Sequence, residues 1–300
     1  MTDVRRPAAT PVVRPADTSA PPSVVLDDVS VTFRVNVDAG KRSGSGGGGK
    51  DGRVMQVKAV KQLSLVARRG EAIGVIGKNG SGKSTLLRAV AGLAPITGGR
   101  VWAASDPTLL GVNAALVPSL SGARNILLGC LALGMTRKEA QAAFDDIVDF
   151  AGIGDAVYRP MATYSSGMGS RLRFAITTAR VPDILLVDEA LNTGDADFRE
   201  RSETRIKELR AQAGTVFLVS HSMATVEETC SRVIWMDNGV LRLDGPADYV
   251  VKRYRNYFAQ RKLARTEGRE PPPLPGPVLG MDEHFRPVHE DPQDNRWARR

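Results

Sequence analysis

The sequence predicts an α/β fold in which helices cover a largely parallel sheet that also carries an inserted helical block. Three apolar runs, AIGVIG at 72–77, ILLVDE at 184–189 and TVFLVS at 215–220, alternate with helical patterns, as parallel strands do in such folds. Ahead of them, VVLDDVSVTFRV at 24–35 alternates apolar and polar residues, and 54–71 has the pattern of returning strands. The early part is therefore expected to be an antiparallel β subdomain.

The helical block lies between the first and second apolar runs, at about 110–175. Its stretch TRKEAQAAFDDIVDFAGI, 136–153, opens with a predicted capping box of Thr136 and Glu139 and places its apolar residues on one face. A helix is expected over this stretch.

The remaining segments differ in composition from this body. Residues 1–22 are rich in Pro and Ala and are predicted to be disordered, and the Gly-rich run 38–53 is predicted to be a flexible insertion in an early hairpin. A single domain is expected over 23–258. A last helix is expected around 249–265, and the Pro-rich, charged part of 259–300 is expected to be an extended tail.

Composition and charge restrict the function. The net charge of +8 lies in the flanks, because residues 62–250 hold equal numbers of basic and acidic side chains. Basic flanks around a neutral body favour a membrane surface or an acidic partner over nucleic acid, although they also serve solubility alone. No run approaches the apolar length of about 18 to 20 residues of a membrane span, so a cytosolic chain is expected. Cys130 and Cys230 are expected to be reduced, buried thiols.

The first Gly-rich turn carries a phosphate-binding pattern. The sequence GKNGSGKS at 77–84 matches the P-loop and lies where that motif belongs, between an apolar strand and the helix that opens with STLL. Its backbone amides and the helix N-terminus are expected to hold phosphates, with Lys83 on the β- and γ-phosphates and Ser84 on Mg²⁺. The predicted ATP-binding residues here are Gly77, Asn79, Gly80, Ser81, Gly82, Lys83, Ser84 and Thr85.

Two further strand ends supply polar side chains. ILLVDE ends on Asp188, expected to bind Mg²⁺ through water, and on Glu189, expected to polarise the attacking water. VFLVSH ends on His221, which falls where a γ-phosphate sensor would lie. Both features also have plainly structural interpretations, since acidic residues and single histidines often end strands. The P-loop upstream is what favours the catalytic one.

Together these motifs resemble those of ATP-binding cassette ATPases. The P-loop, YSSGM at 164–168, ILLVDE, Asp195 and VSH occur in the order and spacing of that family. The resemblance implies that Ser165, Ser166 and Gly167 form a signature motif that contacts the γ-phosphate held by a partner subunit. It also implies a head-to-tail homodimer with two ATP molecules sandwiched between the chains, and a D-loop role for Asp195.

Longer runs resemble one branch of this family, the ATP-binding subunits of O-antigen, teichoic-acid and capsule exporters. GVIGKNGSGKSTLLRAVAGL, TYSSGMGSRLRFAI and LVDEALNTGDADFRERSETRIKEL carry this likeness, and LLGVNAAL resembles the actinobacterial cell-wall galactan exporter. The resemblance implies a peripheral ATPase at the cytoplasmic face of the plasma membrane, driving a separate permease that exports a lipid-linked polysaccharide. A nutrient importer ATPase is the alternative. The short tail predicts that the glycan-binding domain of some relatives is missing.

Two positions depart from the family pattern. Where the family places a glutamine that binds Mg²⁺, this chain has Val112 followed by Asn113, so Asn113 is the candidate for that ligand. Phe33 is the one ring available in the first strand to stack on adenine, but an amphipathic strand also uses such a ring for its core.

Overall fold

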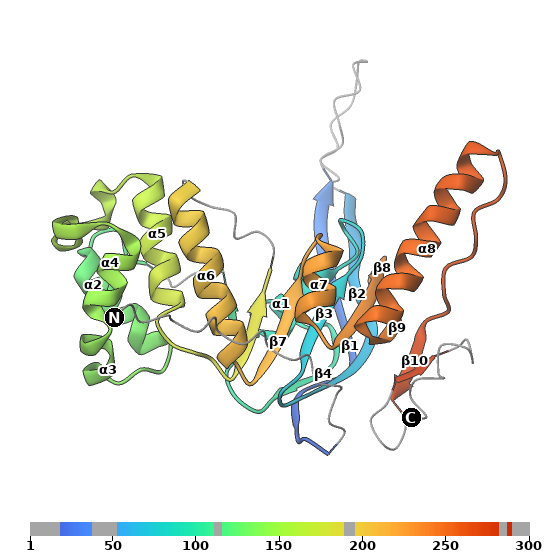
Figure 1. The fold of residues 1–300 in the computed structure, drawn as a ribbon, viewed down its shortest axis with the longest axis horizontal. Coiled ribbons are helices and arrows are strands. Elements are labelled where there is room, and N and C mark those ends of the chain that lie inside the picture. The colour runs from blue at the N-terminus through green and yellow to red at the C-terminus, as the bar shows by residue number, and fades with distance from the viewer. Residues whose placement is uncertain (1–18, 38–52, 111–115, 189–195, 282–286, 290–300) are drawn as a thin grey trace, which may run out of the picture.

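The computed structural model describes residues 19–37, 53–110, 116–188, 196–281 and 287–289. A helical part, a central region of sheets and a long C-terminal helix follow one another across the molecule (Figure 1). The arrangement confirms the predicted α/β class with an antiparallel β subdomain and an inserted helical subdomain.

The central sheet has six strands in the order β5-β6-β7-β3-β8-β9. The first five run parallel, and β9 pairs antiparallel with β8. Every residue of β6, β7 and β8 is buried, because other elements cover both faces of the sheet, which explains why the sequence shows continuous apolar runs here. The strands are β3 (Ala72–Ile76), β5 (Thr108–Leu110), β6 (Ile184–Val187), β7 (Thr215–Val219), β8 (Arg232–Asp237) and β9 (Val240–Pro246).

The antiparallel subdomain is a three-stranded sheet in the order β2-β1-β4. Its strands are β1 (Pro22–Val37), β2 (Arg53–Arg68) and β4 (Gly98–Ala103). Leu26 and Leu65 on this sheet belong to the same buried cluster as Leu86 and Leu87 on α1 (Lys83–Val90). This shared core fixes the helix that follows the P-loop between the two sheets.

The inserted subdomain has its own small core. Its elements are α2 (Gly122–Ala132), α3 (Arg137–Ala142), α4 (Phe144–Ala151), the 3₁₀ turns η1 (Gly154–Tyr158) and η2 (Met161–Thr163), and α5 (Ser166–Thr177). The predicted capping box is confirmed, since Thr136 and Glu139 bond each other's backbone amides. The single helix expected over 136–153 is two helices that meet at Ala143.

Three further helices complete the body: α6 (Ala196–Gln212), α7 (Met223–Thr229) and α8 (Ala247–Thr266). The ring of Phe198 at the start of α6 contacts those of Phe150 and Phe174, with centroids 5.6 and 5.7 Å away. This aromatic contact joins α6 to the inserted subdomain. Cys130 and Cys230 are buried free thiols, as the sequence predicts.

The C-terminal segment departs from the extended tail expected over 259–300. Helix α8 ends at Thr266, as the helix expected around 249–265 predicts, but beyond it β10 (Val278–Met281) pairs antiparallel with β11 (Pro287–His289). Val278 packs against the main core, and His289 Nε2 lies 2.9 Å from the carbonyl oxygen of Asp244 on β9. The described part of this segment therefore folds back onto the body.

A buried ion network fixes the strand that receives this segment. The Arg232 guanidinium donates to both carboxylate oxygens of Asp244, at 2.6 and 2.7 Å, and to Glu71 at 3.1 Å. Burial lowers the pKa of Arg232, but the two carboxylates outweigh it and raise that pKa above its ordinary value. The pairing satisfies charges that would be costly to bury alone.

Candidate functional site

Three strand ends meet at one edge of the central sheet and enclose a cavity. The P-loop follows β3, Asp188 follows β6, and His221 comes two residues after β7, which lies between β3 and β6. The cavity has a volume of about 500 Å³ and is lined by Asn79, Gly80, Ser81, Gly82, Lys83, Ser84, Thr85, Asp188, Val219 and His221. The structure thus brings together most of the predicted phosphate-binding, metal-binding and sensing residues, from segments far apart in sequence.

Backbone shape explains why glycine is needed in the P-loop. Gly82 has a φ of +102°, and a Cβ there would meet the Ala59 carbonyl oxygen of β2 at 2.2 Å. The neighbouring Ser81 carbonyl accepts a hydrogen bond from the amide of Gly239 at 2.9 Å. The loop is therefore held close against the β2 strand and the β8–β9 turn.

Lys83 lies inside the loop that precedes it. Its side chain is buried, and the ammonium donates to the carbonyl oxygens of Gly77 at 2.7 Å and Lys78 at 2.8 Å. The Lys78 carbonyl also accepts the amide of Ser81 at 3.1 Å. A cation fixed at the N-terminus of helix α1, beside the backbone amides of the P-loop, is suited to bind phosphate oxygens.

The donor set of the cavity fits a Mg²⁺-phosphate ligand. Ser81 is 2% exposed and its hydroxyl has no hydrogen-bond partner among the described residues, so a ligand oxygen would satisfy it. The Ser84 hydroxyl and the Asp188 carboxylate line the same cavity, and oxygen ligands of this kind are what Mg²⁺ prefers in proteins.

The predicted signature residues lie elsewhere. Ser165 is the N-cap of α5, where its hydroxyl accepts a hydrogen bond from the amide of Met168 at 3.2 Å, and Ser166 and Gly167 form the first turn. Ser165 and Ser166 are exposed, and none of the three lines the cavity of their own chain. The structure therefore does not place these three residues against a phosphate bound in the cavity of their own chain.

The other predicted site residues divide into two groups. Phe33 is 39% exposed, which removes the alternative that it is a core residue, but it does not line the cavity. It pairs with Val57 on β2. Glu189, Asp195 and Asn113 lie outside the described residues, so their predicted roles stay predictions.

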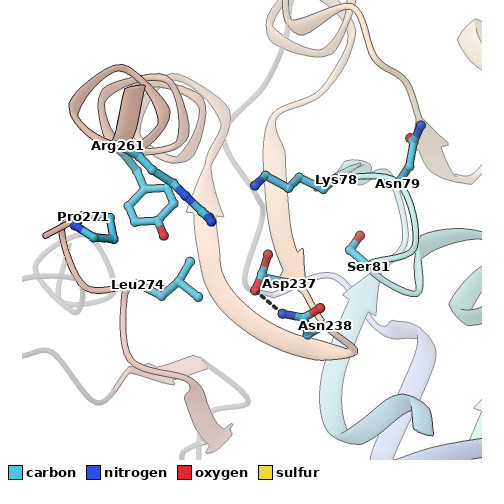
Figure 2. Close-up of a pocket in the computed structure, with 9 residues that line it drawn as sticks. Lys78, Asn79, Ser81, Asp237, Asn238, Arg261, Pro271 and Leu274 are labelled. Atoms are coloured by element: carbon cyan, nitrogen blue, oxygen red, sulfur yellow. Dashed lines mark hydrogen bonds between the residues drawn. The ribbon is translucent and has the colours of Figure 1, made fainter. Parts of the chain in front are cut away.

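The sequence did not reveal a second cavity on the other flank of the P-loop. It has a volume of about 420 Å³ and lies between Lys78, Asn79 and Ser81 of the loop and Tyr257, Arg261, Pro271 and Leu274 of the C-terminal segment, above the β8–β9 turn (Figure 2). One sequence feature lies near it but does not by itself predict it: the spacing of Tyr254, Tyr257 and Phe258, which puts three rings on one face of α8.

Comparison with known proteins identifies the family. A family model described as ABC transporter matches residues 60–192. The teichoic acids export ATP-binding protein TagH of Staphylococcus saprophyticus is 37% identical over 212 residues, which cover 71% of this chain and 80% of that protein. The chain belongs to the ABC transporter family. Its relatives place it in the branch of teichoic acid and O-antigen export ATP-binding proteins, which confirms the resemblance seen in the sequence.

Other relatives in this branch are longer than the matched region. TagH of Levilactobacillus brevis is 44% identical over 195 residues, 65% of this chain and 54% of that protein. The O-antigen export system ATP-binding protein RfbB of Myxococcus xanthus is 37% identical over 219 residues, 73% of this chain and 50% of that protein. The chain thus spans about half the length of most of these curated relatives.

Solved structures support the fold. An ATP-binding subunit of an ABC transporter matches with a TM-score of 0.57 at 19% identity, over 78% of this chain and 93% of that chain. The ATP-binding cassette MJ0796, in a dimeric structure bound to ADP and Pi, matches with a TM-score of 0.55 at 21% identity, over 75% and 98%. No helix in the described part of this chain combines the length and apolarity needed to cross a membrane.

Proposed function

We propose that this ABC protein hydrolyses ATP to power the export of a lipid-linked polysaccharide through a separate membrane permease. The cavity that unites the P-loop, Asp188 and His221 is the observation that carries the ATPase part. The likeness to teichoic acid and O-antigen export proteins supports the substrate class.

The predicted site residues have distinct tasks in this proposal. Lys83 and the loop amides bind the phosphates, and the helix dipole of α1 adds to their attraction. Ser84 and Asp188 would hold Mg²⁺, and the metal would supply charge neutralisation at the phosphates when bound. Glu189 orients and polarises the attacking water as general base. His221 donates toward the γ-phosphate and so senses its presence.

The exposed first turn of α5 completes the site of a second copy. Ser165, Ser166 and Gly167 offer hydroxyls and helix N-terminal amides that their own cavity does not use. In a head-to-tail homodimer these groups would face the partner's γ-phosphate. Nucleotide binding then favours the closed dimer, and phosphate release favours the open one. Asp195 is proposed to link the two sites.

Transport requires the permease, which we propose docks over the inserted helical subdomain at the cytoplasmic face of the plasma membrane. The basic flanks would lie near anionic headgroups, each basic residue adding about 1 kcal/mol at most. A cell-wall galactan remains the narrower proposal for the glycan.

Two measurements test this proposal. Replacing Glu189 by Gln should keep ATP binding, lower turnover by at least about a hundredfold and yield an ATP-dependent dimer in analytical ultracentrifugation. Turnover within about threefold of the parent would remove Glu189 from its role.

Depleting the protein from cells should make full-length glycan accumulate on its lipid carrier inside the cell. If a soluble nutrient stops entering instead, the importer function is the correct one.

A further inference from the structure

The Lys78 side chain of the P-loop contacts the C-terminal helix. The ammonium of Lys78 lies 4.7 Å from the ring centroid of Phe258 on α8, a cation–π distance. In Figure 2 the Lys78 side chain leaves the loop and points across the second cavity toward α8. Some 180 residues of sequence separate the two, so the contact is made only by the fold.

Phe258 is part of a cluster of aromatic rings. Its ring lies 4.6 Å from that of Tyr254, 4.9 Å from that of Tyr257 and 6.1 Å from that of Trp235, centroid to centroid. Trp235 is fully buried on β8, the strand beside β3. The ring that Lys78 meets is therefore fixed to the central sheet, and its position does not depend on the loop.

Lys78 also connects to the phosphate-binding residue through its backbone. The Lys78 carbonyl oxygen accepts the Lys83 ammonium at 2.8 Å and the Ser81 amide at 3.1 Å. Fixing the Lys78 side chain restricts the orientation of that carbonyl, and with it the position of two groups that line the nucleotide cavity. A chain of contacts thus runs from Phe258 through Lys78 to Lys83.

The surroundings of the P-loop make the Lys78–Phe258 contact important for the position of the loop. The space between loop and helix is a cavity of about 420 Å³, so close packing does not hold the two together there. From below, the loop is held by the β8–β9 turn through the Gly239 amide. The Lys78–Phe258 contact restrains it from the side.

We propose that Phe258 is a positioning residue for the P-loop, acting through Lys78 to hold Lys83 ready for phosphate. This inference rests on the proposed nucleotide site. It gives the C-terminal helix a role in ATP binding, although α8 contributes nothing to the motifs of that site.

A double-mutant cycle tests it. The affinity of each protein for a fluorescent ATP analogue is measured with Mg²⁺, and KM and kcat for ATP hydrolysis are measured separately. Phe258→Leu and Lys78→Met should each raise the Kd and the KM by about two- to fivefold, the size of one such contact, with kcat within about twofold. The double variant should be no weaker than either single one. Phe258→Tyr, which keeps the ring, should bind like the parent.

Phe150→Leu is the matched control, because it removes a ring that Arg205 covers at 5.1 Å in the inserted subdomain. It should lower thermal stability without changing the Kd. Additive effects of Lys78→Met and Phe258→Leu, no effect of Phe258→Leu, or failure of Phe258→Tyr to bind like the parent would each overturn the inference. If the unsubstituted protein binds the analogue but does not hydrolyse ATP, the ATPase proposal alone is overturned. The double-mutant cycle on the Kd still tests the role of Phe258.

Discussion

At the scale of single residues, motif positions are predictable when the chemistry fixes both the residue type and the spacing. The sequence predicts Lys83, Asp188 and His221 because phosphate and metal binding need a cation, a carboxylate and a sensor at neighbouring strand ends, and the structure places all three in the lining of one cavity. A ring in an amphipathic strand suits a core or a ligand equally, so the sequence leaves both roles open for Phe33. Its 39% exposure decides against the core.

Cysteine chemistry gives a prediction at this scale. Burial raises the pKa of the Cys230 thiol to about 12 and raises that of Cys130 as well. The thiolate is the reactive form, so neither thiol should react rapidly with Ellman's reagent at pH 8 in the folded protein. In guanidinium both should react. If one thiol reacts rapidly in the native protein, that cysteine is not buried in the folded protein.

The same shift predicts a direction for stability at high pH. A raised pKa means that the folded state keeps the proton of Cys230 while the unfolded chain loses it near the ordinary value of 9.0. The contribution of the protonated Cys230 to the free energy of unfolding is fully present below that value. It is lost as the pH rises from about 9 toward 12.

At the scale of elements, the strands and most helices follow from periodicity, but the C-terminal hairpin does not. β10 and β11 are four and three residues long, and their attachment uses a backbone carbonyl, that of Asp244, and a half-buried Val278. Every residue has a backbone carbonyl, so this acceptor cannot be recognised from the sequence. A Pro-rich run of this composition is also usually extended. The break at Ala143 was missed for a similar reason, because the apolar face continues through it.

Two neighbouring residues of β10 test whether the hairpin is attached. Val278 packs against the core, whereas Leu279 is 64% exposed. Val278→Ala should destabilise the protein by about 1 kcal/mol and lower the midpoint of thermal unfolding, because it leaves a gap against the core. Leu279→Ala, the matched control, should leave the midpoint unchanged. Equal midpoints for both variants would mean that β10 does not pack on the body.

At the scale of the whole molecule, the sequence predicts two halves of the proposed nucleotide site, and the structure shows that the predicted signature residues do not line the cavity of their own chain. The cavity side chains come from strand ends, while Ser165 caps a helix of the inserted subdomain. What the sequence could not show is the flank of the P-loop beside α8. The Lys78–Phe258 contact there joins residues with no common motif or periodicity.

If the site is completed by a second copy, two inactive variants should complement each other. Lys83→Ala removes the phosphate-binding cation, and Ser165→Arg places a bulky cation on the exposed first turn of α5, at a cost of about 1 kcal/mol for the lost cap. A mixed dimer pairs the intact P-loop of the Ser165→Arg chain with the intact signature turn of the Lys83→Ala chain. It therefore has one working site.

With random pairing, an equal mixture should recover about one quarter of the parental ATPase rate, because half of the dimers are mixed and each holds one of two sites. Each variant alone should be nearly inactive. The control mixes the Ser165→Arg chain with a chain that carries both substitutions, which leaves no dimer with a working site and should restore nothing. If the first mixture also stays inactive after subunit exchange has been verified, Ser165 acts within its own chain. The dimeric mechanism would then be wrong, even though the cavity of each chain would still bind ATP.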